Sequence, residues 1–223
     1  MGVTYDVRMP SAAAPRAPLT RERIVTAATT YADQHGLPEL SMRRLAKEVG
    51  FEVMSLYNHV ANKDDLLDAM VDQVAGEIAL PDVEAAGGWK HALRQSAISA
   101  HQRLTRHRWA GSLWGNRMPG PNRLRLMDAT LGVLASAGLG EAMADHGFHA
   151  LTNHIVGYTL QANTLQMPED LQSAGTEFVS AIVEAYPHLA DHVRWHVETD
   201  ARDDESDFEF VLDLILEGLH TPA

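Results

Sequence analysis

Histidines and carboxylates are the side chains of this sequence that could hold a metal ion. Its 223 residues include twelve histidines, and His188, His192 and His196 stand four residues apart. On one continuous helix they would share a face, and two histidines at that spacing are a workable zinc pair. No glutamate lies between them in the general-base position of a metalloprotease, and Asp191 and Glu198 read as solvated acids. We therefore expect a polar helix face, with no metal and no other cofactor.

A second set of polar side chains lies within Leu40–Lys63, a stretch that predicts two short helices joined by a turn. Ser41 is a good N-cap for the first helix, and Gly50, which adopts the left-handed conformation without strain, ends it. The second helix begins at about Glu52. Two helices about a glycine turn form a helix-turn-helix, the framework that places side chains in the major groove of DNA.

The outer face of this second helix carries groups that can read base edges. Its apolar residues recur at i, i+3 and i+7, which turns Met54, Ser55 and Asn58 outward. Asparagine pairs with adenine and a methionine contacts the thymine methyl, while Tyr57 and His59 can reach phosphate oxygens. The chemistry of this stretch is therefore hydrogen bonding to DNA.

The distribution of charge qualifies that prediction. The net charge is −12, yet residues 16–63 carry seven Lys and Arg against five Asp and Glu, and residues 89–127 carry eight against none. Residues 128–223 carry two against seventeen, so the acidity is C-terminal. A mildly basic reader needs two copies and well-placed phosphate contacts for useful affinity.

Composition excludes several classes of protein. The sequence has no cysteine, hence no disulfide, thiolate metal site or cysteine nucleophile. No apolar run approaches the length of a membrane span, and the N-terminus lacks the apolar core of a signal peptide. No nucleophile elbow, P-loop or dinucleotide fingerprint occurs. We expect a cytoplasmic protein that is not an enzyme and makes no membrane contact.

Apolar periodicity predicts an all-α protein, because no strand-like alternation persists. We expect a flexible N-terminal arm over residues 1–18, rich in alanine and proline. Residues 19–80 form a three-helix DNA-binding domain with a connecting helix, and residues 88–221 form a larger C-terminal domain. The helices expected beyond the first four are residues 89–106, a short helix followed by an irregular loop within 109–122, then 123–137, 141–166, 173–185 with a continuation to about 195, and 208–219, with an acidic loop over 198–207.

In this arrangement the sequence resembles TetR-family transcriptional regulators. The resemblance rests on the motifs Leu-Ser-Met-Arg-Arg-Leu-Ala at 40–46, Leu-Tyr at 56–57, His-Val at 59–60 and Leu-Leu-Asp at 66–68, together with Gly50. The C-terminal half resembles the tetracycline-repressor branch, through the order of Trp89, His107-Arg108 and the Gly115, Arg117, Pro119 turn.

The resemblance implies a homodimeric regulator, most often a repressor, that a small-molecule inducer releases from palindromic double-stranded operator DNA. The second helix of the motif then enters the major groove. Arg43, in the preceding helix, can pair with guanine. The predicted DNA contacts are Thr20, Arg43, Val53, Met54, Ser55, Tyr57, Asn58, His59 and Lys63.

Ligand chemistry is where the sequence departs from the tetracycline repressor. Trp114 stands where the repressor has its magnesium-binding histidine, and Ser96 stands where it has its ligand-binding asparagine. The histidine of the repressor's fourth helix falls near Ala79. These changes argue against tetracycline as the inducer. The candidate contacts for another ligand are Trp89, Ser96, Ala100, His101, Trp114, Met118, Met127, Leu131, Asn153 and Gly157, although apolar faces at helical spacing are ordinarily core.

The last helix carries an apolar stripe too wide for one buried face, over Phe208–Leu219. With the helix over residues 141–166 and a second copy of both, it predicts a four-helix dimer interface. A buried helix within one chain is the alternative. His146 and His149 lie opposite Leu151 on the 141–166 helix, so one side meets the pocket and the other a partner. Two further functions stay open for the C-terminal domain, a metal-dependent hydrolase and a protein-interaction module.

Overall fold

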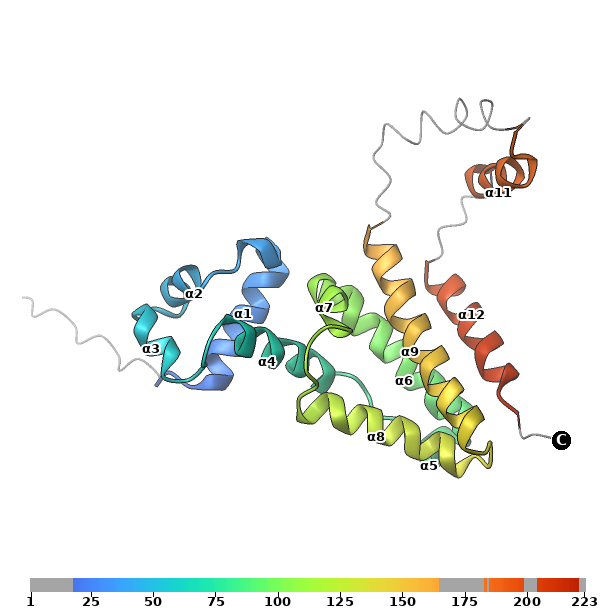
Figure 1. Cartoon of the computed structure of the whole chain (residues 1–223), viewed down its shortest axis with the longest axis horizontal. Coiled ribbons are helices and arrows are strands. Elements are labelled where there is room, and N and C mark those ends of the chain that lie inside the picture. The colour runs from blue at the N-terminus through green and yellow to red at the C-terminus, as the bar shows by residue number, and fades with distance from the viewer. Residues whose placement is uncertain (1–17, 165–182, 184, 199–203, 221–223) are drawn as a thin grey trace, which may run out of the picture.

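The computed structural model describes residues 18–164, 183, 185–198 and 204–220, and every regular element within these ranges is helical (Figure 1). The all-α prediction is therefore confirmed. The elements are α1 Arg21–His35, the 3-10 helix η1 Leu37–Glu39, α2 Met42–Val49, α3 Val53–Tyr57, α4 Lys63–Gly76, α5 Val83–Ala86, α6 Trp89–Arg106, α7 Arg108–Trp114, α8 Pro121–Ser136, α9 Glu141–Thr164, α11 Pro187–Glu198 and α12 Asp204–Gly218.

Side-chain caps set the beginnings of the N-terminal helices. Thr20, Ser41 and Asn62 each accept the backbone N–H three residues ahead, at 3.2, 3.3 and 2.8 Å. These bonds satisfy amides that have no partner inside the helix. Gly50 ends α2 with φ 76° and ψ 33°, the left-handed conformation expected of it.

The connecting helix α4 ends at Gly76, four residues before the end of the predicted segment 19–80 that contains it. The reason lies at Ala79, because two serines of α6 form hydrogen bonds with its backbone carbonyl and N–H groups. The Ser96 hydroxyl donates to its carbonyl at 2.7 Å, and its N–H donates to Ser99 Oγ at 3.0 Å. A neighbouring helix thus supplies the partners that another helical turn would have supplied.

Two helices of the C-terminal half begin earlier than the sequence predicts. Helix α8 begins at Pro121 instead of Arg123, since proline suits the first turn, where its missing N–H costs nothing. Helix α12 begins at Asp204 instead of Phe208, so the predicted acidic loop is partly helix. Acidic residues are favoured in the first turn by the helix dipole.

Two predicted segments lie largely outside the described residues. Most of the arm over 1–18 is outside, as is the helix over 173–185 apart from turns at Val183 and Ala185. The short helix α5 lies between the two predicted domains, residues 19–80 and 88–221.

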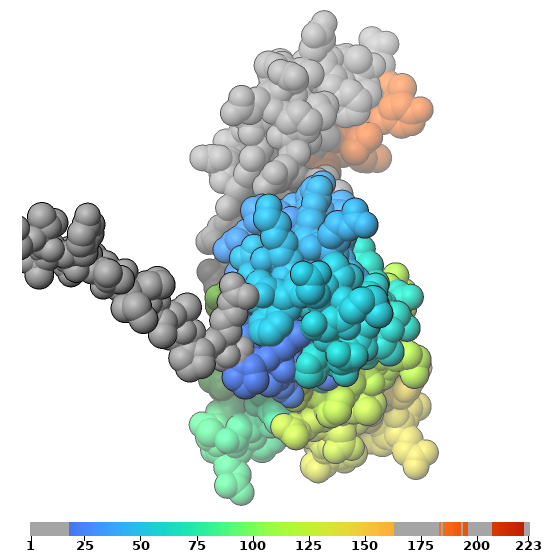
Figure 2. Space-filling model, turned by 90° about the vertical axis from the view of Figure 1, so that its left-hand side faces the viewer, coloured from blue at the N-terminus to red at the C-terminus, as the bar shows by residue number. Residues whose placement is uncertain are grey.

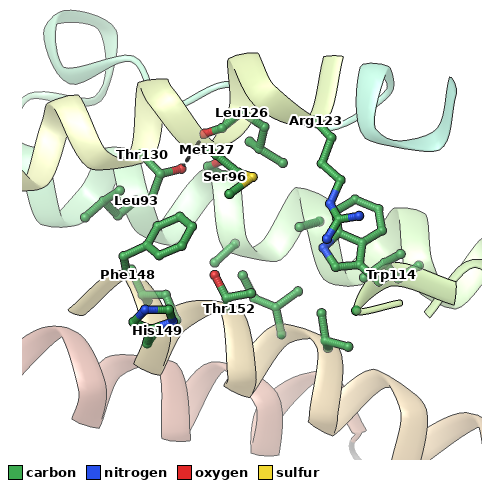
Figure 3. A pocket seen from close by; sticks show the side chains of 17 residues that line it. Leu93, Ser96, Trp114, Arg123, Leu126, Met127, Thr130, Phe148, His149 and Thr152 are labelled. Carbon is green, nitrogen blue, oxygen red and sulfur yellow. Dashed lines mark hydrogen bonds between the residues drawn. The ribbon is translucent and has the colours of Figure 1, made fainter. Parts of the chain in front are cut away.

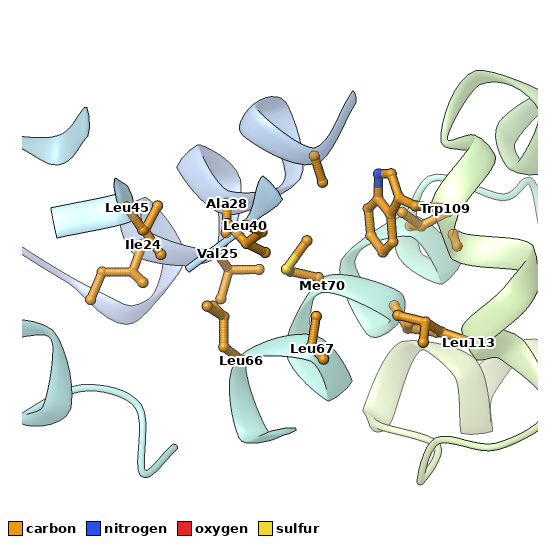
Figure 4. Close-up of a cluster of buried hydrophobic side chains, with 14 of the residues drawn as sticks. Ile24, Val25, Ala28, Leu40, Leu45, Leu66, Leu67, Met70, Trp109 and Leu113 are labelled. Carbon is orange, nitrogen blue, oxygen red and sulfur yellow. The ribbon is translucent and has the colours of Figure 1, made fainter. Parts of the chain in front are cut away.

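Buried side chains form two clusters. The first runs from α1, α2 and α4 into α7, where Trp109 and Leu113 pack against the N-terminal helices (Figure 4). The second joins α6, α8, α9 and α12 around residues such as Leu134 and Phe208. The first core therefore continues past the predicted domain boundary, which couples the N-terminal helices to the C-terminal half.

A bidentate ion pair ties α1 to the beginning of α4. Arg21 Nη2 and Nη1 donate to Asp65 Oδ1 and Oδ2 at 2.6 and 2.8 Å, and Arg21 Nη1 also donates to the His59 carbonyl at 3.0 Å. Asp65 Oδ2 accepts the N–H of Ala61 at 2.8 Å. The hydrogen bond from Arg21 lowers the pKa of Asp65 to about 2.

Asp65→Asn is therefore expected to lower the free energy of unfolding at neutral pH by about 1 kcal/mol, because the pair is partly solvent-screened. A lowered carboxyl pKa contributes stability that is complete above 3.8, the ordinary value, and is lost as the pH falls towards 2. Urea unfolding across this range measures it, with the exposed Glu48→Gln as the control. A difference that stayed constant below pH 3.8 would contradict this role.

Candidate DNA-reading face and ligand cavity

Helices α2 and α3 lie at one end of the molecule, far from α9 and α12 (Figure 1). The view onto that end shows their surface facing outward (Figure 2). The buried Leu45 and Leu56, both fully inaccessible, anchor the two helices on the first core. The motif thus presents a firmly supported outer face.

The predicted reading residues divide into exposed and supporting side chains. Met54 exposes 72% and Tyr57 41% of its surface, and Arg43 and Asn58 are exposed beside them. The half-buried Ser55 lies between them in sequence. This set has the donors, acceptors and methyl-contacting groups that reading bases requires.

The other four predicted DNA contacts also have structural roles. Thr20 caps α1, and Val53 packs against the first core. Lys63 donates from Nζ to the Leu40 carbonyl at 2.9 Å, which holds the beginning of α4 against the turn before α2. An ammonium has three N–H groups, so the exposed lysine keeps donors for a phosphate. The carbonyl of His59 accepts from Arg21, which fixes the chain just beyond the end of α3.

A cavity of about 380 Å³ lies between α6, α8 and α9, with α7 at one end (Figure 3). Its lining is mostly apolar, and its size suits a small organic molecule. Four of the predicted ligand contacts line it: Ser96, Ala100, Trp114 and Met127.

The other six predicted contacts do not line the cavity. Half-buried Trp89 packs on the second core, and Met118 exposes 77% of its surface. Leu131, Asn153 and Gly157 are exposed. His101 is buried away from the cavity: its Nδ1 lies 2.8 Å from Thr159 Oγ1 and its ring stacks on Phe208, with centroids 4.1 Å apart.

Most residues of the cavity wall were not predicted, because they belong to helices whose packing cannot be read from the sequence. Helix α8 supplies Arg123, and α9 supplies a run of residues on one face. One signal was available, since Arg123 belongs to the segment that has eight basic residues and no acid. The remaining lining residues are Leu93, Ala97, Leu104, Gly115, Leu126, Thr130, Phe148, His149, Leu151, Thr152, Ile155 and Val156.

The wall of the cavity is fastened directly to α4. Asp72 of α4 accepts the backbone N–H groups of Asn122 and Arg123 at 3.3 and 2.9 Å, which caps α8. A Cβ on Gly120 would lie 2.4 Å from the Asp72 carboxyl carbon, so only glycine permits this approach. Arg117 also pairs with Asp64 of α4 at 2.7 Å.

The buried His107 connects the N-terminal helices to the C-terminal half. His107 Nδ1 lies 2.9 Å from Asp33 of α1, and its Nε2 lies 3.3 Å from Glu77, just beyond α4. Trp109 Nε1 donates to the same Asp33 oxygen at 2.7 Å. We call Asp33, Glu77, His107 and Trp109 the interdomain clamp.

Helix α12 has a buried and an exposed apolar side. Phe208 and Leu212 are fully buried, whereas Phe210 exposes 65% and Leu214 54% of its surface. Arg94 of α6 holds the helix through hydrogen bonds to Asp213 and Glu209, both at 2.7 Å, which raise the pKa of Arg94. The exposed residues Asn153 and Gly157 lie on α9, which packs against α12.

The histidine face of α11 has the predicted helical backbone. His188 and His192 are exposed, and the side chain of His196 lies outside the described residues. In the described part of the chain, no three His, Cys, Asp or Glu side chains gather as a metal site. Searched over the same residues, no helix is long and apolar enough to cross a bilayer.

Two family models match the chain. The model for bacterial regulatory proteins of the tetR family matches residues 24–70, and that for the tetracyclin repressor-like C-terminal domain matches residues 80–222. The second covers the cavity, the clamp histidine and α12, and it confirms the predicted resemblance of the C-terminal half.

Curated relatives and solved structures agree with these matches. An HTH-type transcriptional regulator of Saccharopolyspora erythraea is 35% identical, over 77% of this chain and 74% of its own. An HTH-type transcriptional repressor of Mycobacterium tuberculosis is 30% identical, over 91% and 80%. The Streptomyces coelicolor TetR family protein ActR, solved in complex with (S)-DNPA, is 32% identical, with a TM-score of 0.76 over 91% of this chain and 98% of its own. ActR is also solved with actinorhodin.

Proposed function

The chain belongs to the tetR family and is a DNA-binding transcriptional regulator, and we propose that it represses as a homodimer that a small molecule releases from operator DNA. The observation that carries this proposal is the attachment of the cavity wall to α4. Asp72 of α4 holds the first turn of α8, and the N-terminal end of α4 carries Lys63 beside the reading helices. Residues 19–80 act as reader and residues 88–221 as sensor, in the cytoplasm.

A ligand in the cavity would release DNA by favouring a different position of α4. Helix α6 lines the cavity and holds Ala79, three residues beyond the end of α4, through Ser96 and Ser99, while α8 is bonded to Asp72 within α4. A molecule that separates α6 from α8 therefore moves both attachments of one helix. It changes operator affinity only by the ratio of its affinities for the DNA-competent and the released state.

The named ligands of a relative support a sensing role for the cavity. ActR, similar over most of both chains, is solved with (S)-DNPA and with actinorhodin. Of the predicted ligand contacts, the cavity geometry supports Ser96, Ala100, Trp114 and Met127.

The proposed homodimer forms through α9 and the exposed side of α12, as the apolar stripe predicts. Two readers about one DNA turn apart would then contact both halves of a palindromic operator. Doubling matters here because the reader segment is only mildly basic.

Asn58→Ala is expected to weaken specific operator binding by about 1 to 3 kcal/mol, because it removes a side chain able to bond both edge groups of adenine. The measurement is the dissociation constant for the operator, located in DNA flanking the coding region, and for random DNA at the same salt. Asn116→Ala, at an exposed loop position, is the matched control. If the wild type bound operator and random DNA equally, the proposed function would be wrong.

A further inference from the structure

Arg123 places a guanidinium at one end of an otherwise apolar cavity. Its Cζ lies 5.0 Å from the centroid of the Trp114 ring, and its Nη1 donates to the Arg117 carbonyl at 3.1 Å. Figure 3 shows this pair at the opposite end of the cavity from Phe148 and His149. Burial lowers the pKa of Arg123, whereas the nearby charge of Asp72 raises it.

This arginine has no carboxylate partner of its own in the described part of the chain, unlike Arg94 and Arg117, which form ion pairs at 2.7 Å. Asp72, whose charge raises the pKa of Arg123, uses its oxygens to accept the backbone N–H groups of Asn122 and Arg123. A half-buried cation without a hydrogen-bonded anion is costly, since burial removes water and the nearby charge of Asp72 offsets that loss only in part. The site is therefore electrostatically incomplete without an anion.

The rest of the lining limits the shape of that anion. Trp114 and Phe148 border the cavity at its two ends, and Leu126 and Met127 line the space between them. The Ser96 hydroxyl is occupied by the Ala79 carbonyl, so it offers a ligand no free proton. Such walls favour a flat, apolar body, for which aromatic rings are suited.

We propose that the cavity takes a planar aromatic carboxylate, with its carboxylate on the Arg123 guanidinium and its rings between Trp114 and Phe148. This inference rests on the proposed function, because it names the class of molecule that acts as inducer. Arginine suits the task, since its two parallel N–H groups match the two oxygens of a carboxylate. A neutral analogue of the same shape would leave the cation unpaired and would be rejected.

Isothermal titration calorimetry with the full chain tests the proposal, with 2-naphthoate and 2-anthroate compared against their primary amides. The carboxylates are expected to bind at least about tenfold more tightly than the amides, the ratio typical of one charge-assisted bond. Arg123→Gln should abolish this ratio. Arg125→Gln removes the same charge from an exposed position two residues away and should keep it.

Other outcomes would overturn the proposal. These are equal affinity of acid and amide for the wild type, an unchanged preference in Arg123→Gln, or no binding of either carboxylate at millimolar concentration. The acid and amide comparison on the wild type stands even if Arg123→Gln fails to fold. Operator release is measured separately: release by acid and amide alike would refute the carboxylate and support the proposed function. Tight binding of the acid that left operator affinity unchanged would support the carboxylate and refute the proposed function.

Discussion

Phe210→Arg combined with Leu214→Arg is expected to convert the proposed homodimer into folded monomers and to lower operator affinity about a hundredfold or more. Both side chains are exposed on α12, at 65% and 54%. Charges there would be desolvated against the same charges of a second copy. The buried side of the helix, Phe208 and Leu212, is unaffected, so each chain keeps its fold. Each monomer then carries one reader in place of two.

Light scattering for mass, circular dichroism for folding and an operator titration measure these effects together. Glu217→Arg, exposed on the same helix but polar in the wild type, is the control and should stay dimeric. An unaltered mass for the double variant would remove α12 from the interface. Loss of helical signal would instead show that the exposed side supports the single chain.

The two sides of α12 show what the sequence could predict and what it could not. The width of the apolar stripe indicated that one buried face could not hold all of it. It did not say which residues the chain buries itself, and Leu212 is fully inaccessible within one chain. An arginine there would unfold the helix before it tested any interface. That division depends on contacts with α6 and α9, which lie far away in sequence.

Local signals account for the parts of the fold that were predicted best. Thr20, Ser41 and Asn62 act as caps and Gly50 ends α2, because these features depend on residues within one helical turn. The end of α4 was missed since Ala79 is bonded by serines of another helix. Where the partner is distant in sequence, periodicity carries no information about it.

The cavity follows the same rule. The sequence made Ser96 and Ala100 of α6 candidate ligand contacts, and both line the cavity. His101 was a candidate contact as well. Its imidazole instead hydrogen-bonds Thr159 and stacks on Phe208, both more than fifty residues away in the sequence. Arg123 lines the cavity because Asp72 of α4 fixes the first turn of α8, a contact that no local pattern reveals.

The interdomain clamp is also assembled from distant segments, and it gives the second large expected effect. Asp33→Ala is expected to lower the free energy of unfolding by about 2 to 3 kcal/mol, because it leaves two buried donors, on His107 and Trp109, without their acceptor. Urea unfolding of the full chain measures it. Asp33→Asn keeps one acceptor oxygen and should lose less than half as much, while Gln34→Ala, at the next and exposed position, should change little.

The same variant should weaken communication between cavity and reader. His107 lies at the junction of α6 and α7 and binds Asp33 on one side and Glu77 on the other, so it links the beginning of the C-terminal half to both α1 and the end of α4. A ligand changes DNA affinity only if the two halves move as coupled bodies. In Asp33→Ala the fold-change in operator affinity caused by a ligand should therefore shrink, at ligand concentrations that saturate the cavity. An undiminished fold-change, in a variant that is nonetheless less stable, would show that α4 alone transmits the signal.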